Sequence, residues 1–126
     1  MAGTSPMFTI EERADMVRRS VERFPNVEVR TSDMLLAEYA KQFEGAVIVK
    51  GLRAASDFEY EFQMDLINKN IDHELETLFM PSDGKYTFLS SSVVREMARY
   101  GASLEGLVPE CIIPDIENKA KQWRQN

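Results

Sequence analysis

The chain has 126 residues and carries 15 Lys and Arg against 21 Asp and Glu, a net charge of −6. This acidic balance argues against a general nucleic-acid surface, which needs a broad positive field. The composition, 44% hydrophobic and 29% charged, is that of one globular domain, and no apolar run approaches the roughly 18 residues that span a bilayer. We therefore expect neither nucleic acid nor membrane among its partners.

Cysteine and histidine usage narrows the chemistry further. With one cysteine, Cys111, and one histidine, His73, the sequence offers no internal disulfide framework and no Cys/His cluster for zinc. This usage makes the cytoplasm the expected compartment. The segment "MAGTSPMFTI" lacks the pattern of a signal peptide. We interpret residues 1–5 as a leader and residues 6–126 as a single domain, and we predict no protein-bound metal.

Helical spacing and capping signals define the first predicted elements. Thr9 and Glu12 form a capping-box pattern in front of a helix predicted over Ile10–Phe24. The alternating segment "NVEVR", residues 26–30, predicts a strand. Residues 32–45, "SDMLLAEYAKQFEG", then predict a second helix that ends near a glycine.

A continuous apolar stretch, "AVIVK" at residues 46–50, predicts a strand that is buried on both faces of a parallel sheet. Ser56 and Glu59 then form a second capping-box pattern, and the helix behind it should run to about Asn70. The segment "ELETLFM", residues 74–80, predicts a third strand.

The rest of the chain continues the alternation. Residues 81–88 read as a loop, residues 90–101 predict a helix with hydroxyls at its start and glycine at its end, and Pro114 opens a last amphipathic helix. Alternating strands and helices predict an α/β domain with a parallel sheet and right-handed crossovers. Three strands make a thin sheet, because about five are usual in doubly wound folds.

The most distinctive polar residues follow two predicted strands, where open α/β sheets bind ligands. Gly51 lets the backbone turn and approach a ligand, while Lys50 and Arg53 supply a point charge and a planar fork for phosphate oxygens. The alternative is a loop with two solvated cations. The second such segment is Tyr86–Ser92.

Three serines, Ser90, Ser91 and Ser92, stand where a helix begins, so unpaired N–H groups and hydroxyls there could face one anion. Ordinary N-capping is the alternative, and it explains one serine better than three. Glu61 lies in the helix after the cations, where it could hold Arg53, accept from a ribose hydroxyl, or simply be a solvated charge.

In combination, "PMFTIEER", "VKGLRAASDFEYEFQ" and "YTFLSSSVVRE" resemble the phosphopantetheine adenylyltransferase family, from Pro6 to about Pro109. The resemblance implies a Rossmann-like parallel sheet of the nucleotidyltransferase superfamily. It also implies an enzyme of coenzyme A biosynthesis, which transfers the adenylyl group of ATP to 4′-phosphopantetheine with Mg²⁺ present, giving dephospho-coenzyme A and pyrophosphate. Members of the family are commonly homohexamers.

Site residues are implied by the same resemblance. The positions that match phosphopantetheine contacts are Leu36 and Lys50, and Lys50 departs from the arginine that often stands there. The positions that match ATP contacts are Gly51, Leu52, Arg53, Glu61, Tyr86, Thr87, Phe88, Leu89, Ser90, Ser91 and Ser92.

The family begins with a strand and a loop that bears a T-x-G-H-type motif, whose histidine stabilises the transition state, followed by a second strand and a Lys-bearing segment. In this sequence no His precedes Met7 and no Lys precedes Lys41, and His73 matches no catalytic position. We interpret the chain as an amino-terminally shortened member whose sheet lacks the first strands, and we assign no catalytic residue.

Three functions remain open at this point. The first is adenylyl transfer to phosphopantetheine, which turnover with both substrates would reveal. The second is a non-catalytic nucleotide-binding or assembly remnant of that enzyme, which would bind ATP and release no pyrophosphate. The third is another nucleotidyltransferase with a different acceptor, for which nicotinamide mononucleotide is the obvious trial substrate.

Overall fold

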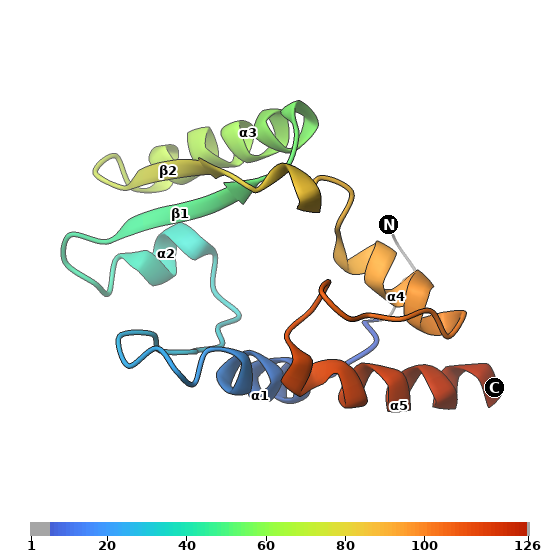
Figure 1. The fold of residues 1–126 in the computed structure, drawn as a ribbon. Helices are drawn as coiled ribbons and strands as arrows, with labels where there is room; N and C mark the ends of the chain where they lie inside the picture. The colour runs from blue at the N-terminus through green and yellow to red at the C-terminus, as the bar shows by residue number, and fades with distance from the viewer. Residues whose placement is uncertain (1–5, 126) are drawn as a thin grey trace. The chain divides into compact units, whose positions relative to one another are not determined.

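The computed structural model describes residues 6–125, which form five α-helices, two short 3₁₀ helices and two strands (Figure 1). Contacts divide the chain into two compact units: unit 1 combines the chain before Ser32 with the chain from Leu89 onward, and unit 2 is Ser32–Phe88. The elements are α1 Ile10–Ser20, α2 Leu36–Ala40, β1 Val47–Leu52, α3 Ala55–Ile71, β2 Glu76–Pro81, η1 Gly84–Tyr86, α4 Ser91–Arg99, η2 Glu110–Ile112 and α5 Ile113–Gln125.

The predicted domain boundaries are not decided by this division. The predicted leader, residues 1–5, lies outside the described residues. That residues 6–126 form a single domain stays a prediction.

Helix α1 of unit 1 begins with the predicted capping box. The Glu12 backbone N–H donates to Thr9 Oγ1 at 3.1 Å, and the Thr9 N–H donates to Glu12 Oε1 at 2.9 Å. Both bonds satisfy N–H groups that have no partner inside the helix. The helix ends at Ser20 and not at Phe24, because Pro25 disfavours helical backbone in the residue before it and the chain turns beforehand.

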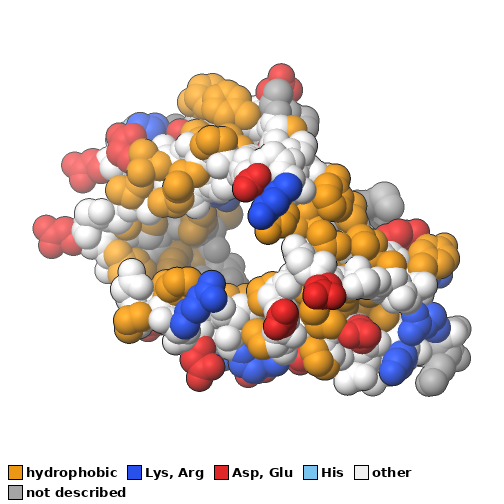
Figure 2. Space-filling view, viewed as in Figure 1, with side chains coloured by type: hydrophobic (Ala, Val, Ile, Leu, Met, Phe, Trp, Pro, Cys, Tyr) orange, Lys and Arg blue, Asp and Glu red, His pale blue; other side chains and the backbone are white. Residues whose placement is uncertain are grey.

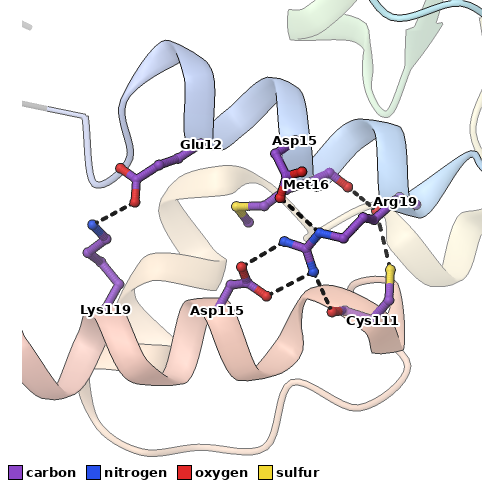
Figure 3. Close-up of polar contacts among 8 residues, drawn as sticks. Glu12, Asp15, Met16, Arg19, Cys111, Asp115 and Lys119 are labelled. Atoms are coloured by element: carbon purple, nitrogen blue, oxygen red, sulfur yellow. Dashed lines mark hydrogen bonds and ion pairs between the residues drawn. The ribbon is translucent and has the colours of Figure 1, made fainter.

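Two ion pairs fasten α1 to α5 within unit 1 (Figure 3). The Arg19 guanidinium donates to both carboxylate oxygens of Asp115, at 3.1 and 2.7 Å, and to the Cys111 carbonyl oxygen at 3.0 Å. At the other end of α1, Lys119 Nζ lies 3.0 Å from Glu12 Oε2. The bidentate geometry fixes direction as well as distance, so these side chains set the register of the two helices.

Glu12 makes the stability of unit 1 depend on pH. The Thr9 backbone N–H, followed by Lys119, holds the pKa of the Glu12 carboxyl below its ordinary value of 4.5. A lowered folded-state pKa adds stability that is present above 4.5 and is lost as the pH falls through the folded-state pKa. We expect urea unfolding to show wild type more stable than Glu12→Gln at neutral pH, with the difference vanishing in acid. Glutamine can still form the capping box, so a constant difference would contradict this assignment.

The core of unit 1 is built by α1, α4, α5 and the loop before η2. Its buried members are Met16, Ala98, Leu104, Ile116 and Ala120. Ala98 and Ala120 are small, which permits close approach of α4 and α5. Gly101 follows α4 with φ +74°, the left-handed conformation that glycine adopts without steric cost, as the sequence predicts.

Unit 2 contains the sheet, in which β1 and β2 are parallel neighbours with Val49 opposite Leu78 and Leu52 opposite Pro81. Helix α3 connects the two strands and packs on them, with the Phe58 ring edge-on to Phe79 at 5.5 Å. This strand–helix–strand order with parallel pairing confirms the predicted α/β class. Helices α2 and α3 pack together, and Ala37, Ala40, Ile48 and Leu75 form the buried cluster of the unit.

One face of the strands carries exposed apolar side chains, and hydrophobic groups reach the surface of this unit (Figure 2). Ile48 is buried, but Val49 and Leu78 are each 58% exposed. The prediction that residues 46–50 are buried on both faces is therefore wrong for this structure. Val49 and Leu78 are exposed because α3 and α2 cover only the side of the strands on which Ile48 lies.

Two predicted elements are also corrected. The strand predicted at residues 26–30 is wrong: residues 27–32 are irregular and Val27 is 47% exposed. Period-two alternation forms a strand only where a partner supplies hydrogen bonds, and both described strands pair with each other in unit 2. The helix predicted over residues 32–45 is reduced to the five residues of α2, because the chain leaves the helix in turns before Gly45, whose φ is +71°.

The start of α3 differs from its predicted form. The N-cap is Ala54, whose side chain makes no capping bond, and the helix begins at Ala55, one residue before Ser56. The predicted capping box of Ser56 and Glu59 is therefore wrong. Instead, the Asp57 carboxylate in the first turn of α3 accepts a hydrogen bond from the backbone N–H of Arg53 at 3.1 Å.

Candidate active site

The two polar segments predicted to form a site begin at one edge of the sheet. Leu52 and Pro81, the last residues of β1 and β2, are paired, and the Ser82 N–H donates to the Leu52 carbonyl oxygen at 2.7 Å. The chain thus leaves both strands side by side, with Arg53 following one and Ser82 the other. This is the carboxyl end of a parallel pair, where open α/β sheets bind ligands.

Gly51 lies inside β1 and not in the loop. Its φ is outside the left-handed region, and a Cβ placed there would meet Ser82 Oγ at 3.7 Å, an ordinary contact. The predicted turn at Gly51 is wrong, because the ladder to β2 continues through Leu52. Its predicted role in admitting a ligand close to the backbone stays a prediction.

Lys50 is held by a carboxylate of α3. Its Nζ lies 3.2 Å from Glu61 Oε2, and the two side chains are 33% and 23% exposed. Glu61 Oε2 is enclosed and makes no well-formed hydrogen bond, so the contact is a charge pair without fixed direction. The interpretation that Glu61 holds Arg53 is wrong, since its cationic partner is Lys50.

Arg53 is held by a different carboxylate, that of Asp57. The guanidinium donates from Nε to Oδ2 at 2.9 Å and from Nη2 to Oδ1 at 3.0 Å, a two-pronged pair. This hydrogen bonding holds the pKa of the Asp57 carboxyl below its ordinary value and raises the pKa of Arg53. Both groups therefore stay charged at neutral pH.

The remaining predicted residues of unit 2 lie in its helices and loop. Leu36 is the first residue of α2 and is 45% exposed. Tyr86 ends η1 and stacks under the Lys85 ammonium, whose Nζ is 5.0 Å from the ring centre. Thr87 donates its hydroxyl to the Gly84 carbonyl oxygen at 2.7 Å, and Phe88 is exposed. Backbone and side chain bonds thus give this loop a defined course.

The three predicted serines stand at the start of α4 in unit 1, each in a different setting. Ser90 is the N-cap, and its Oγ accepts the Val93 N–H at 3.1 Å. Ser92 Oγ accepts from Arg95 Nη2 at 3.2 Å. Ordinary capping therefore accounts for Ser90 alone.

Ser91 lines a cavity of about 330 Å³ within unit 1. Its walls come from the chain before α1, from α1 itself and from α4 and α5, and they are mainly apolar. The lining residues are Pro6, Met7, Phe8, Arg13, Met16, Ser91, Val94, Arg95, Val108 and Ile116.

The predicted ATP segment crosses from unit 2 to unit 1 between Phe88 and Leu89. Lys50 and Glu61 are in contact, and Arg53 follows Lys50 in the sequence, directly after the last residue of β1. The approach of Leu89 and the serines to these cations stays a prediction.

Residues 6–125 contain no group of three or more His, Cys, Asp or Glu side chains that could hold a metal ion. Among the described helices, none is both long and apolar enough to cross a bilayer.

Two parallel strands joined by a helix, with Lys50 inside β1 and Arg53 just after it, place the chain in the α/β class, and comparison with known families agrees. The family model described as cytidylyltransferase-like matches residues 2–97, so the chain has the nucleotidyltransferase fold. Among curated proteins, the chain is 48% identical over 117 residues to the phosphopantetheine adenylyltransferase of Dictyoglomus turgidum, covering 93% of this chain and 73% of the relative.

Further relatives carry the same description. The protein of Finegoldia magna is 49% identical over 112 residues, 89% of this chain and 69% of the relative. That of Clostridium kluyveri is 49% identical over 120 residues, 95% of this chain and 73% of the relative. The chain belongs to the phosphopantetheine adenylyltransferase family, and it spans about seven tenths of the length of these relatives.

Asp57 was not among the predicted site residues of this region. Its signal was present, because an acid four residues after an arginine can reach it when a helix begins between them. The predicted capping box put the start of this helix at Ser56, and Glu61 was the acid named as a possible partner of Arg53.

Proposed function

We propose that this protein transfers the adenylyl group of ATP to 4′-phosphopantetheine. The name of its relatives, phosphopantetheine adenylyltransferase, supports adenylyl transfer to phosphopantetheine. The observation that carries the proposal is the similarity over about nine tenths of the chain, and the matching family model spans residues 2–97, which include both cations. In this reaction a phosphate oxygen of phosphopantetheine attacks the α-phosphorus of ATP. The bond from that phosphorus to the bridging oxygen breaks, and pyrophosphate leaves with the electron pair.

The residues suit a reaction between two phosphates. Such a transfer needs alignment of nucleophile and leaving group and neutralisation of charge, with no covalent intermediate on the protein. Lys50 is assigned to the phosphate of phosphopantetheine and Arg53 to the phosphates of ATP, while the N–H groups and hydroxyls at the start of α4 are assigned to ATP. Glu61 and Asp57 keep the two cations in place.

Magnesium enters the proposal as part of the nucleotide substrate. Mg²⁺ is commonly bound through substrate phosphates and water with few protein ligands. The carboxylates nearest the cations, Asp57 and Glu61, are each paired with a cation. The residues present therefore fit a magnesium–ATP complex that is gripped by its phosphates, and no protein ligand is assigned to the ion.

The decisive experiment measures pyrophosphate release by the 126-residue chain with ATP, Mg²⁺ and 4′-phosphopantetheine, beside a chimera that adds the unmatched part of a relative. Release by either protein that depends on phosphopantetheine supports the proposal. Nicotinamide mononucleotide serves as the alternative acceptor, and its preferential use would reject phosphopantetheine. ATP binding without any release would favour the non-catalytic remnant, and absence of both from both proteins would refute the assignment.

The assembly implied by the resemblance and the location expected from the cysteine usage also belong to the proposal. We infer a homohexamer in the cytoplasm. Light scattering coupled to gel filtration tests the first, and a mass of one or two chains at micromolar concentration would reject the hexamer.

A further inference from the structure

Asp57 bonds to Arg53 in a way that differs from the other short-range ion pairs of the described chain. Its Oδ2 accepts both the Arg53 backbone N–H at 3.1 Å and the Nε–H at 2.9 Å, and its Oδ1 accepts from Nη2 at 3.0 Å. By contrast, Lys41 meets Glu38 through one contact at 3.5 Å. One carboxylate thus ties the arginine side chain back to the main chain of the same residue.

This arrangement fixes the direction of the guanidinium. A guanidinium carries five N–H donors in one plane, so holding it by two of them sets the direction of the others. The anchor is also firm at its own end, since Asp57 lies in the first turn of the 17-residue helix α3. The side chains are 37% and 25% exposed, which leaves the pair within reach of a ligand.

We propose that Asp57 is a positioning residue for ATP: it presets the Arg53 guanidinium at the carboxyl end of β1, so that the nucleotide phosphates meet donors already in place. This inference rests on the proposed function, because it takes the phosphates of ATP as the ligand of Arg53. The benefit is that the flexible arginine is ordered during folding, and its conformational entropy is not lost again on binding.

The direction in which a mutation of Asp57 changes ATP affinity distinguishes positioning of Arg53 from simple neutralisation of its charge. A carboxylate beside bound phosphates repels them, so removing its charge should tighten ATP binding if Asp57 merely neutralises Arg53. Removing the anchor should weaken binding if Asp57 positions Arg53. Asp57→Asn keeps the size and an acceptor for the Arg53 N–H, but its amide cannot accept both guanidinium donors.

The test is isothermal titration of ATP, with Mg²⁺, into the full chain. We expect Asp57→Asn to weaken binding about threefold to tenfold, the cost of ordering one arginine side chain. In the Arg53→Ala background the same change should not weaken binding and should tighten it slightly, because no guanidinium is left to position and an unneutralised carboxylate beside the phosphates is removed. A structural defect would lower affinity in both backgrounds. Glu59→Gln is the matched control, since it removes an exposed charge from the same helix turn.

The outcomes separate this inference from the function on which it rests. Wild-type binding that is weakened by Arg53→Ala but unchanged or tightened by Asp57→Asn overturns the positioning role alone. No ATP binding by wild type overturns both the ATP site and the role. If Asp57→Asn does not fold, as judged by its thermal unfolding, Asp57→Glu keeps the charge with a longer side chain and should show a smaller loss of the same sign.

Discussion

Lys50→Ala is expected to weaken binding of 4′-phosphopantetheine by about 10- to 100-fold, the usual range for losing a hydrogen bond to a charged group. The physical reason is that the ammonium of Lys50, two residues before the end of β1, is held by Glu61 and is assigned to the phosphate of this substrate. ATP affinity should change much less. Fluorescence or calorimetric titration with each ligand separately measures the two effects.

Two variants sharpen the Lys50 experiment. Lys50→Arg keeps the charge and should retain most of the affinity, because the resemblance implies that arginine is common at this position. Lys69→Ala is the matched control: Lys69 is similarly exposed and is also paired with a carboxylate, Glu76 at 3.0 Å, but it lies in the last turn of α3. Equal losses for both ligands, or for both lysines, would contradict the assignment.

Leu104→Ala should lower the free energy of unfolding of unit 1 by about 2–5 kcal/mol. Leu104 is 2% exposed and lies among Ala98, Ile116 and Ala120, whose small or helix-bound side chains cannot move in to fill the space. The loss therefore combines lost burial with a residual cavity. Urea unfolding followed by circular dichroism measures it.

A control for Leu104 lies in the same unit. Val17→Ala also removes apolar carbon, but Val17 is 47% exposed on α1, so we expect a change of less than about 1 kcal/mol. Similar losses for the two variants would show that the loop around Leu104 is not part of the core in solution.

Local signals in the sequence predicted elements well where a single segment decides the outcome. The capping pattern of Thr9 and Glu12 and the serine that starts α4 both appear as expected, because each depends only on residues three positions apart. The parallel pairing of β1 and β2 was also predicted, since their apolar runs are separated by a helix-length connection.

Predictions failed where the outcome depends on a distant partner. The alternation at residues 26–30 is real, yet no strand forms there, because alternation does not say whether another strand is available. In the candidate site, residue types and strand ends identified the two cations, but the pairing of Lys50 with Glu61 and Arg53 with Asp57 depended on where α3 begins. The N-cap is Ala54, two residues before the predicted cap Ser56, and Asp57 therefore lies in the first turn of α3 where it reaches Arg53.

The attachment of α1 to α5 has a consequence for how the polypeptide acquires its structure. Arg19 and Asp115 are 96 residues apart in sequence, and Glu12 and Lys119 are 107 apart. During synthesis, α1 therefore emerges long before its partners exist, whereas Ser32–Phe88 is a continuous stretch whose contacts are complete earlier. Closing such long loops is entropically costly and slow. The apolar side of α1 therefore stays unprotected until the chain through Lys119 has left the ribosome.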